Sequence, residues 1–123
     1  MKKKILIVED ESSLLSALVE KLTKEGFETL EAKNGEEGLV MAKKEKPDLI
    51  LLDIVMPVMD GITMLKQMRN SDWGKEISVI MLTNLSEDDK VDESLENGAF
   101  EYLVKSDWKL EDVVKKIRIR LSI

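Results

Sequence analysis

The chain has 123 residues and 43% of them are apolar, which is enough for one folded domain with its own core. Its formal net charge is −6, which argues against a surface that binds nucleic acid directly. It contains no cysteine and no histidine, so disulfides, thiol nucleophiles, histidine-based catalytic triads and zinc sites with these ligands are excluded.

The first residues, 1–4, are basic apart from Met1 and precede only four apolar residues, 5–8. This apolar run is too short for a signal-peptide core or a membrane span, so we expect a cytoplasmic protein without membrane contact. The run is instead typical of a short strand that is buried on both faces, and it ends at Glu9 and Asp10.

Helical and strand patterns alternate through the rest of the chain. Apolar residues at three- and four-residue spacings predict helices, and short continuous apolar runs predict strands. The expected N-caps are Ser12 or Ser13 for the first helix and Ser106 or Asp107 for the last. We expect strands over residues 5–8, 27–32, 49–52, 77–82 and 99–104, and helices between residues 12 and 26, 34 and 46, 61 and 70, 86 and 98, and 106 and 121.

Strand and helix therefore alternate five times with short connections. This pattern predicts an α/β fold, with a doubly wound parallel sheet, right-handed crossovers and helices on both faces. No internal repeat, low-complexity tract or linker interrupts it, so we expect residues 1–123 to form one domain.

The most informative stretch is residues 47–61, where an apolar run ends at Asp53 and a turn containing Pro57 leads into a helix at Gly61. A carboxylate at the carboxyl end of a buried strand lies at the edge where open α/β sheets bind ligands. Aspartate also commonly starts turns, so this stretch alone leaves a turn residue and a reactive group equally open.

Polar residues follow four of the five expected strands. Glu9 and Asp10 follow the first, Asp53 the third, Thr83 the fourth and Lys105 the fifth. Parallel strands point the same way, so we expect these groups to gather at one edge of the sheet. Three carboxylates and one ammonium leave a net charge of −2 at that edge.

Clustered carboxylates either raise a pKa or recruit a cation, and hard oxygen ligands suit Mg²⁺ or Mn²⁺. A divalent ion, an ammonium and a hydroxyl around one carboxylate can hold a phosphoryl group, and a carboxylate can accept that group covalently. The sequence contains no glycine-rich phosphate loop and no dinucleotide fingerprint, so it shows no means of binding a nucleotide.

These residues, in this order and at these strand ends, resemble the receiver domain of bacterial two-component response regulators, in particular chemotaxis-regulator-like single-domain receivers. The resemblance covers nearly the whole chain. It is carried by residues 5–10, by Asp53 with residues 56–61, by Thr83 and by residues 100–105.

The resemblance implies a flavodoxin-like (βα)5 fold whose sheet has the strand order 2-1-3-4-5. It also implies that a histidine kinase or a phosphotransfer protein phosphorylates Asp53, which would bind Mg²⁺ directly together with Asp10. Glu9 would act on the metal through a water molecule, and the backbone carbonyl of Met56 would be a further ligand.

Further roles follow from the same resemblance. Lys105 would pair with one phosphoryl oxygen and Thr83 would hydrogen-bond another. Tyr102 matches the switch aromatic of the family, which turns inward when Thr83 moves toward the phosphoryl group. The face formed by residues 86–121 would then bind a downstream protein or a second copy of the chain.

The fourth expected helix fits such a switch. Between residues 87 and 97 its only aliphatic residues are Val91 and Leu95, and a helix with few apolar anchors costs little to shift. A solvated surface helix without a switching role is the alternative.

The chain departs from the common pattern of the family at several positions. Ser106 follows Lys105 where proline is frequent, so a cis bond at that junction would cost about 3 kcal/mol more than the trans form. Asn84 stands where a small residue is usual, which would restrict access to the phosphorylation site. Val55 and Leu85 are apolar at the two positions that flank the attacking water, so we expect slow self-dephosphorylation.

Three other functions stay open. A Mg²⁺-dependent phosphatase with Asp53 as its nucleophile usually carries a second aspartate two residues later, where this chain has Val55. A flavodoxin-like FMN binder would need a phosphate loop after the first strand, where residues 9–11 are acidic and would repel a phosphate. A degenerate receiver that acts only as a docking surface would not need the complete acidic, threonine and lysine set.

We therefore expect a signalling module that is not an enzyme, apart from catalysing its own phosphorylation and slow dephosphorylation. The last expected helix ends with the chain, which slightly favours a stand-alone receiver without an output domain over a fragment of a longer regulator.

Overall fold

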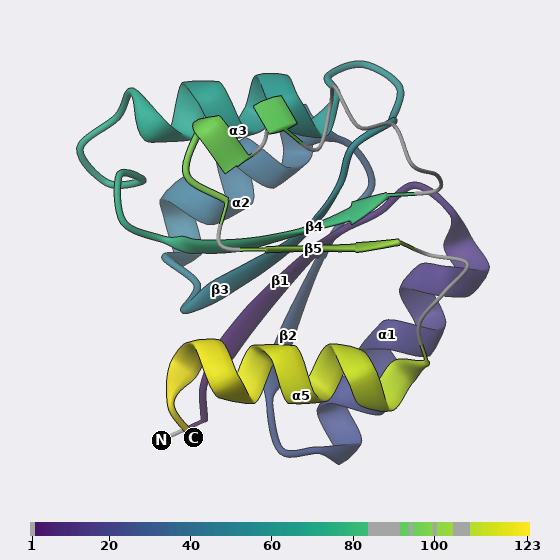
Figure 1. The fold of residues 1–123 in the computed structure, drawn as a ribbon. Coiled ribbons are helices and arrows are strands. Elements are labelled where there is room, and N and C mark those ends of the chain that lie inside the picture. The colour runs from purple at the N-terminus through teal and green to yellow at the C-terminus, as the bar shows by residue number, and fades with distance from the viewer. Residues whose placement is uncertain (1, 84–91, 94, 100, 105–108) are drawn as a thin grey trace.

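Strands and helices alternate along the chain in this computed structural model (Figure 1). The structure describes residues 2–83, 92–93, 95–99, 101–104 and 109–123. The strands are β1 (Lys4–Val8), β2 (Glu28–Ala32), β3 (Leu49–Asp53), β4 (Ser78–Thr83) and β5 (Glu101–Val104). The helices are α1 (Ser12–Lys24), α2 (Gly35–Glu45), α3 (Gly61–Arg69) and α5 (Leu110–Leu121), and residues 92–93 and 95–96 are also helical.

The strands form one parallel sheet in the order β2-β1-β3-β4-β5. This order confirms the expected doubly wound fold. The chain order reverses between β1 and β3, where Val8 pairs with Leu52 in register. The carboxyl ends of these two strands therefore meet at the point where such sheets bind ligands.

Each face of the sheet is covered by helices. Figure 1 shows α2 and α3 above the sheet and α1 and α5 below it. Successive residues of a strand point to opposite faces, so Ile5 and Ile7 pack in the core under α1 and α5 while Leu6 and Val8 pack in the core under α2 and α3. Within the described residues no helix is long and apolar enough to span a membrane.

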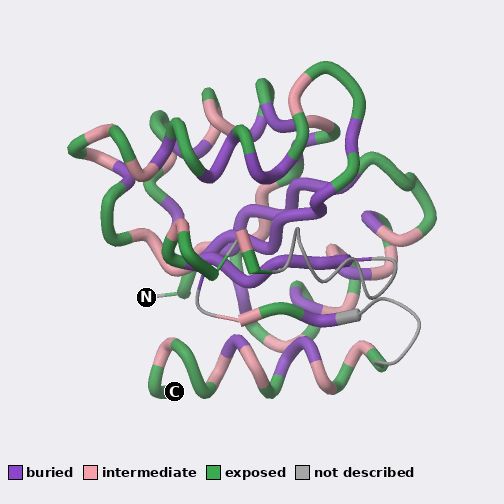
Figure 2. Tube along the Cα trace, turned by 45° about the horizontal axis from the view of Figure 1, so that its top comes forward, coloured by how far each residue is buried: buried purple, intermediate pink, exposed green. Residues whose placement is uncertain are grey.

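The central strand β3 is buried along its whole length, as Figure 2 shows for the middle of the sheet. Its four apolar side chains, residues 49–52, are fully inaccessible to solvent. Burying one side chain of this size stabilises a fold by about 1.5–3 kcal/mol, which is why the run carries no alternating polar residue. Asp53 is the one ionisable residue of this strand and lies at its carboxyl end.

Two helix starts differ from the expected ones. Ser12 and Ser13 lie inside α1, whose N-cap is Glu11 and has no side-chain capping hydrogen bond. The N-cap of α5 is Lys109, so neither Ser106 nor Asp107 caps this helix. The reason at α5 is Asp112, whose carboxylate accepts a hydrogen bond from the Lys109 amide at 2.8 Å and so stabilises a later start.

The start of α2 agrees with the sequence. Asn34 is the N-cap, and its side-chain oxygen accepts a hydrogen bond from the Glu37 amide at 2.9 Å. The fourth expected helix is described only in part: its expected start at Ser86 and its expected anchor Val91 lie outside the described residues. Its expected end at Gly98 is confirmed, since Gly98 has a left-handed φ of +87°.

Candidate functional site

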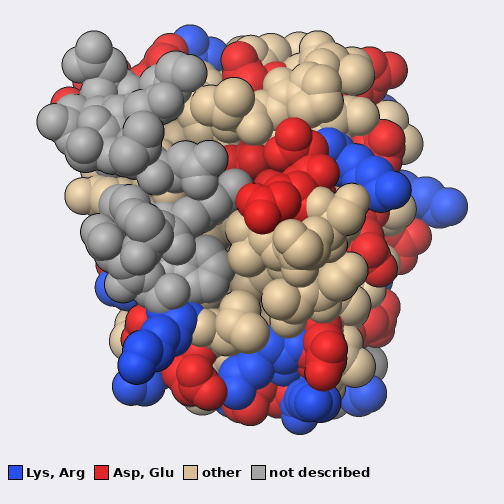
Figure 3. All heavy atoms as spheres, turned by 90° about the vertical axis from the view of Figure 1, so that its right-hand side faces the viewer, with Lys and Arg blue, Asp and Glu red and all other residues tan. Residues whose placement is uncertain are grey.

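Three carboxylates from two neighbouring strands meet at the carboxyl edge of the sheet. Glu9 and Asp10 follow β1 directly, and Asp53 ends β3. One carboxylate oxygen from each lies within 4.8 Å of the other two. Glu9 and Asp53 are buried whereas Asp10 is exposed, so the cluster has a solvent-facing side. Figure 3 views the molecule toward this edge and shows acidic side chains gathered near its centre.

The donor set of this cluster suits a hard divalent cation. All three side chains offer oxygen, the ligand type that Mg²⁺ and Mn²⁺ prefer. Like charges at this separation repel one another, and a divalent ion offsets that repulsion. The Glu11 amide donates a hydrogen bond to Glu9 Oε2 at 3.0 Å and orients this carboxylate. The residues present therefore fit a magnesium ion.

Thr83 lies at the same edge, on the next strand. Asp53 pairs in register with Leu82, and the Ile54 amide donates to the Leu82 carbonyl at 3.2 Å. Thr83 follows Leu82 and is 1% exposed. Adjacent strands lie about 4.8 Å apart, so Thr83 borders the position of Asp53 and does not lie across the molecule.

The lysine predicted for the site follows the last strand. Val104 pairs with Thr83 in register, so β5 ends at the same edge as β4. Lys105 is the next residue and lies outside the described part of the chain, as do Asn84, Leu85 and Ser106. Their expected roles therefore stay predictions.

The loop between β3 and α3 folds back over the carboxyl end of β3. Met56 is buried, whereas Val55 is 57% exposed. Val58 has a left-handed φ of 68°, and the Met59 amide donates to the Pro57 carbonyl at 2.8 Å. A β-branched residue with positive φ is rare and marks a backbone that its surroundings hold in place.

Both ends of this loop are tied down by hydrogen bonds. The Gly35 amide, at the start of α2, donates to the Met59 carbonyl at 2.8 Å. Asp60 is the N-cap of α3 and accepts from the Thr63 amide at 2.8 Å. The Gly61 amide donates to the carbonyl of the residue after Asp53, also at 2.8 Å. These contacts fix the backbone around the carboxylate cluster.

The sequence interpretation did not assign Gly35 or Gly61 a role in the site. A Cβ on Gly35 would approach the Met59 carbonyl oxygen to 2.5 Å, so the loop contacts α2 at a position where only glycine fits. The signal was present in the sequence as the two dipeptides Asn34–Gly35 and Asp60–Gly61, which by themselves indicate only a turn and a helix start.

Tyr102, the expected switch aromatic, belongs to β5 and pairs with Met81 in register. Its side chain is 40% exposed. It lies between residues 92–99 and α5 in the sequence, on the expected switch face. The part of that face described by the structure consists of residues 92–93, 95–99, 101–104 and 109–121.

Known proteins share this sequence pattern. A family model for the response regulator receiver domain matches residues 5–118. The sporulation initiation phosphotransferase F of Bacillus subtilis is 42% identical over 118 residues, which cover 94% of this chain and 94% of that protein.

Solved structures share the fold as well as the sequence pattern. A CheY-like response regulator receiver domain protein from Methanospirillum hungatei superposes with a TM-score of 0.92 at 30% identity, and the match covers 99% of this chain and 95% of the other. A chain of the CheX-CheY-BeF3-Mg+2 complex from Borrelia burgdorferi superposes with a TM-score of 0.88 at 32% identity, covering 97% of this chain and 89% of that one. The chain therefore belongs to the response regulator receiver domains of two-component signalling.

Proposed function

We propose that this chain accepts a phosphoryl group on Asp53 from a histidine kinase or a phosphotransfer protein, with Mg²⁺ at the carboxylate cluster. The observation that carries the proposal is the meeting of Glu9, Asp10 and Asp53 within 4.8 Å at the carboxyl edge of a receiver fold. Asp53 is the proposed acceptor because it ends the central strand and lies beside the exposed Asp10, through which the cluster faces solvent.

In the proposed reaction a carboxylate oxygen of Asp53 attacks the phosphorus of a phosphohistidine on the partner. The P–N bond breaks, the histidine leaves with the electron pair, and the product is an aspartyl phosphate. Phosphoryl transfer depends on position and charge neutralisation more than on covalent help, so the remaining residues act by holding charge in place.

Asp10 and Asp53 would hold the metal directly, Glu9 through a water molecule, and Met56 through its backbone carbonyl. When bound, Mg²⁺ would supply positive charge that offsets the negative charge of the carboxylates and of the incoming phosphoryl group. Thr83 would donate its hydroxyl to one phosphoryl oxygen from the neighbouring strand. Mn²⁺ has the same ligand preference and would serve in its place.

Lys105 would neutralise a second phosphoryl oxygen from the end of β5, and Tyr102 would report the change. The Tyr102 side chain is 40% exposed, which supports an outward starting position for the inward turn that the resemblance implies. Movement of Thr83 toward the phosphoryl group would open space for Tyr102 to turn inward. Near-complete switching from a rare active state needs about 5 kcal/mol of differential stabilisation.

The output is a protein surface and not a reaction. The face formed by residues 86–121 would bind a downstream protein or a second copy of the chain, in the cytoplasm and without direct contact to nucleic acid or membrane. One relative is named a phosphotransferase of sporulation initiation, and one solved neighbour is a complex with a second protein, BeF3 and Mg+2. Both names support a role in phosphoryl signalling.

A metal-dependent phosphatase is less well supported. Its second acid would stand two residues after Asp53, and that residue is Val55, an apolar side chain with 57% of its surface exposed. The proposed protein therefore turns over no external phosphate ester, and catalyses only its own phosphorylation and slow dephosphorylation.

The proposal is tested by intact-mass measurement after incubation with acetyl phosphate and Mg²⁺. The wild type is expected to gain the mass of one phosphoryl group, and Asp53→Asn is expected to gain none. If the wild type gains no mass, or if Asp53→Asn gains as much as the wild type, Asp53 is not the phosphoryl acceptor.

A further inference from the structure

Arg69, the last residue of α3, donates hydrogen bonds to four backbone carbonyl oxygens. Nε reaches Asn97 at 3.2 Å and Nη2 reaches Gly98 at 2.9 Å. Nη1 reaches Gly74 at 2.7 Å, and Nη2 also reaches Ile77 at 2.8 Å. One side chain thus joins the connection between α3 and β4 to the stretch that precedes β5.

Asn97 and Gly98 are the end of the fourth helix. The Asn97 amide donates to the Glu93 carbonyl and the Gly98 amide to the Leu95 carbonyl, both at 3.1 Å. The last carbonyls of a helix have no partner within it and carry the negative end of the helix dipole. The Arg69 guanidinium donates to the carbonyls of Asn97, at the helix end, and of Gly98, the residue after it, and its positive charge matches the negative end of the dipole.

Gly98 makes this contact possible. Its φ of +87° is a conformation that glycine adopts without strain. A Cβ at this position would lie 2.9 Å from Arg69 Nε, closer than real side chains approach. The helix end and the guanidinium are therefore fitted to each other.

The Arg69 guanidinium is partly buried, and this burial lowers its pKa from the ordinary value, with a smaller effect from the charge of Arg120. Arginine stays protonated in proteins, so a charge is held here at a desolvation cost. Hydrogen bonds to four carbonyl oxygens offset this desolvation cost. An arginine on the open surface would have no such cost to offset.

The other described attachments of the fourth helix are weaker. Glu93, one turn before the helix end, forms an ion pair with Lys66, and both side chains are more than 40% exposed. Exposed ion pairs contribute little to stability. Leu95 is 41% exposed and so buries only part of its apolar surface. Among the described contacts of the fourth helix, the strongest is that of Arg69 with its carboxyl end.

We propose that Arg69 is a positioning residue of the switch, which holds the end of the fourth helix at Asn97 and Gly98 so that phosphorylation turns the helix about this end. The proposal extends the proposed function, because it names the residue about which the switch face moves. The Lys66–Glu93 pair is the contact that opens in this movement, and the four Arg69 contacts are the ones that stay.

A matched contact elsewhere in the chain provides a control. Arg118 Nη2 of α5 donates to the carbonyl of Glu25 at 3.2 Å, and Glu25 is the C-cap of α1. Gly26 follows with a φ of +95°, and its amide donates to the Thr23 carbonyl at 3.1 Å. This is the same kind of arginine-capped helix end, at a distance from residues 92–99.

The first experiment measures amide hydrogen exchange by NMR without Mg²⁺ and without phosphodonor, so its result does not depend on whether Asp53 accepts phosphate. Arg69→Met is expected to accelerate exchange at Asn97 and Gly98 by at least about tenfold beyond any global change, since the carbonyls of these two residues lose a charged donor and the helix end that carries their amides opens more often. Arg118→Met is expected to accelerate Gly26 and to leave Asn97 and Gly98 unchanged.

Two further variants separate the effect of the Arg69 hydrogen bonds from that of the neighbouring ion pair and of charge alone. Lys66→Met is expected to leave exchange at Asn97 and Gly98 within about twofold of wild type, because exposed ion pairs contribute little. If Arg69→Met does not fold, Arg69→Lys retains the charge without the planar fork and is expected to accelerate both amides severalfold. Equal acceleration by Lys66→Met, or acceleration only at Gly74, would overturn the proposal.

The second experiment compares wild type before and after phosphorylation that intact mass has verified. We expect the exchange rates of Asp92 and Glu93 to change while Asn97 and Gly98 keep their protection. Equal loss of protection at all four amides would show that the helix detaches as a whole. The proposed rotation about Asn97 and Gly98 would then be wrong, although the phosphorylation chemistry would still hold.

Discussion

Gly61 lies directly against the backbone of Asp53. A Cβ on Gly61 would come to 3.0 Å from the Asp53 carbonyl carbon and closer still to its carbonyl oxygen. The Gly61 amide also donates to the carbonyl of Ile54 at 2.8 Å. The start of α3 and the end of β3 are therefore in contact through backbone atoms, next to the residue that carries the Asp53 carboxylate.

Gly61→Ala is expected to destabilise the fold by about 2–3 kcal/mol, because the added methyl group can be accommodated only by a backbone shift. The shift moves Asp53 relative to Glu9 and Asp10, so Mg²⁺ affinity is expected to fall as well. Urea denaturation measures the first effect and titration calorimetry with MgCl2 the second.

Gly26→Ala is the control for this change. Gly26 has open space around a Cβ but a φ of +95°, so alanine costs about 1–2 kcal/mol through backbone strain alone. Its Mg²⁺ affinity is expected to equal that of wild type. If Gly61→Ala also binds Mg²⁺ like wild type, the contact does not position Asp53.

Asp10→Asn is expected to weaken Mg²⁺ binding by at least about tenfold, because affinity for a hard cation depends on the number of ligand charges. Asp60→Asn is the matched control: it removes a charge from the adjacent loop, and asparagine caps α3 about as well as aspartate. Calorimetry with MgCl2 compares the two variants. Equal weakening would mean that general charge and not coordination determines the affinity.

Replacing Val55 with Asn and Leu85 with Glu is expected to accelerate loss of the phosphoryl group from Asp53. The apolar pair cannot orient a water molecule, and a positioned polar group contributes about a hundredfold at the lower end of its range. The decay is followed by intact mass after removal of acetyl phosphate. Val40→Asn, at an exposed valine on α2, should lose phosphate at the wild-type rate, and equal rates in all variants would contradict the prediction.

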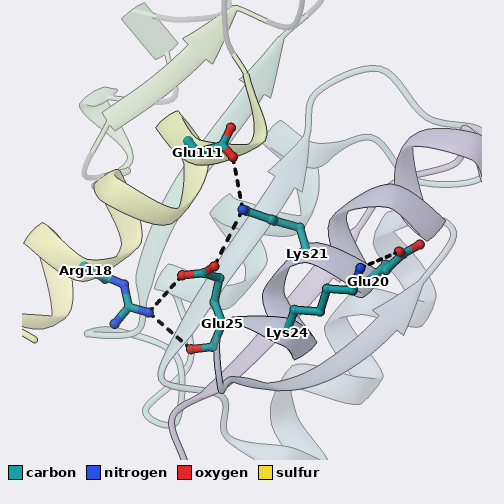
Figure 4. Close-up of polar contacts among 6 residues, drawn as sticks. All are labelled: Glu20, Lys21, Lys24, Glu25, Glu111 and Arg118. Atoms are coloured by element: carbon teal, nitrogen blue, oxygen red, sulfur yellow. Dashed lines mark hydrogen bonds and ion pairs between the residues drawn. The ribbon is translucent and has the colours of Figure 1, made fainter.

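A network of ion pairs joins α5 to α1 and to the C-cap residue of α1 (Figure 4). Lys21 Nζ lies 3.2 Å from Glu111 and 3.6 Å from Glu25, and Arg118 lies 3.3 Å from Glu25. Arg118 also stacks over the Phe27 ring at 5.3 Å from its centroid. The Lys21 contact lowers the pKa of Glu111, and the Glu111 contact is the main cause that raises the pKa of Lys21.

These two pKa shifts predict the pH range in which the pair stabilises the fold. Since the pKa of Glu111 is lower in the folded chain, its contribution is present above the ordinary value of 4.5 and is lost as pH falls through the folded value. Since the pKa of Lys21 is raised, the contribution is complete below 10.5 and is lost as pH rises through the folded value.

Glu111→Gln is accordingly expected to lower the urea midpoint at neutral pH, with the difference from wild type shrinking as pH falls below the carboxyl range. Glu111 is exposed and Lys21 is partly exposed, so water and salt screen the pair and the effect is small and sensitive to salt. Glu20→Gln, in the exposed Lys24–Glu20 pair within α1, serves as the comparison. A difference at Glu111 that persists unchanged in acid would show that packing and not charge is responsible.

Most of the fold could be predicted from local patterns. The uninterrupted apolar runs at residues 5–8 and 49–52 were enough to identify buried parallel strands. When helices cover both faces of a strand, each of its side chains is buried and none can be polar without cost. The first residues of α1 and α5 were predicted less accurately than the strands. There Glu11 and Lys109 are the caps; at α5 the contact between Asp112 and the Lys109 amide decides the start, whereas Glu11 makes no side-chain capping bond at α1.

The order of the polar residues was enough to reveal the resemblance to the receiver domains, and the parallel sheet explains why the strands that they follow end at one edge. The contacts that hold this edge and the end of the fourth helix became visible only in the folded chain. Gly61 against Asp53 and Arg69 against Asn97 join residues that are not neighbours in sequence, and no local propensity encodes them. They exist because packed elements bring distant backbone carbonyls within hydrogen-bonding or van der Waals range.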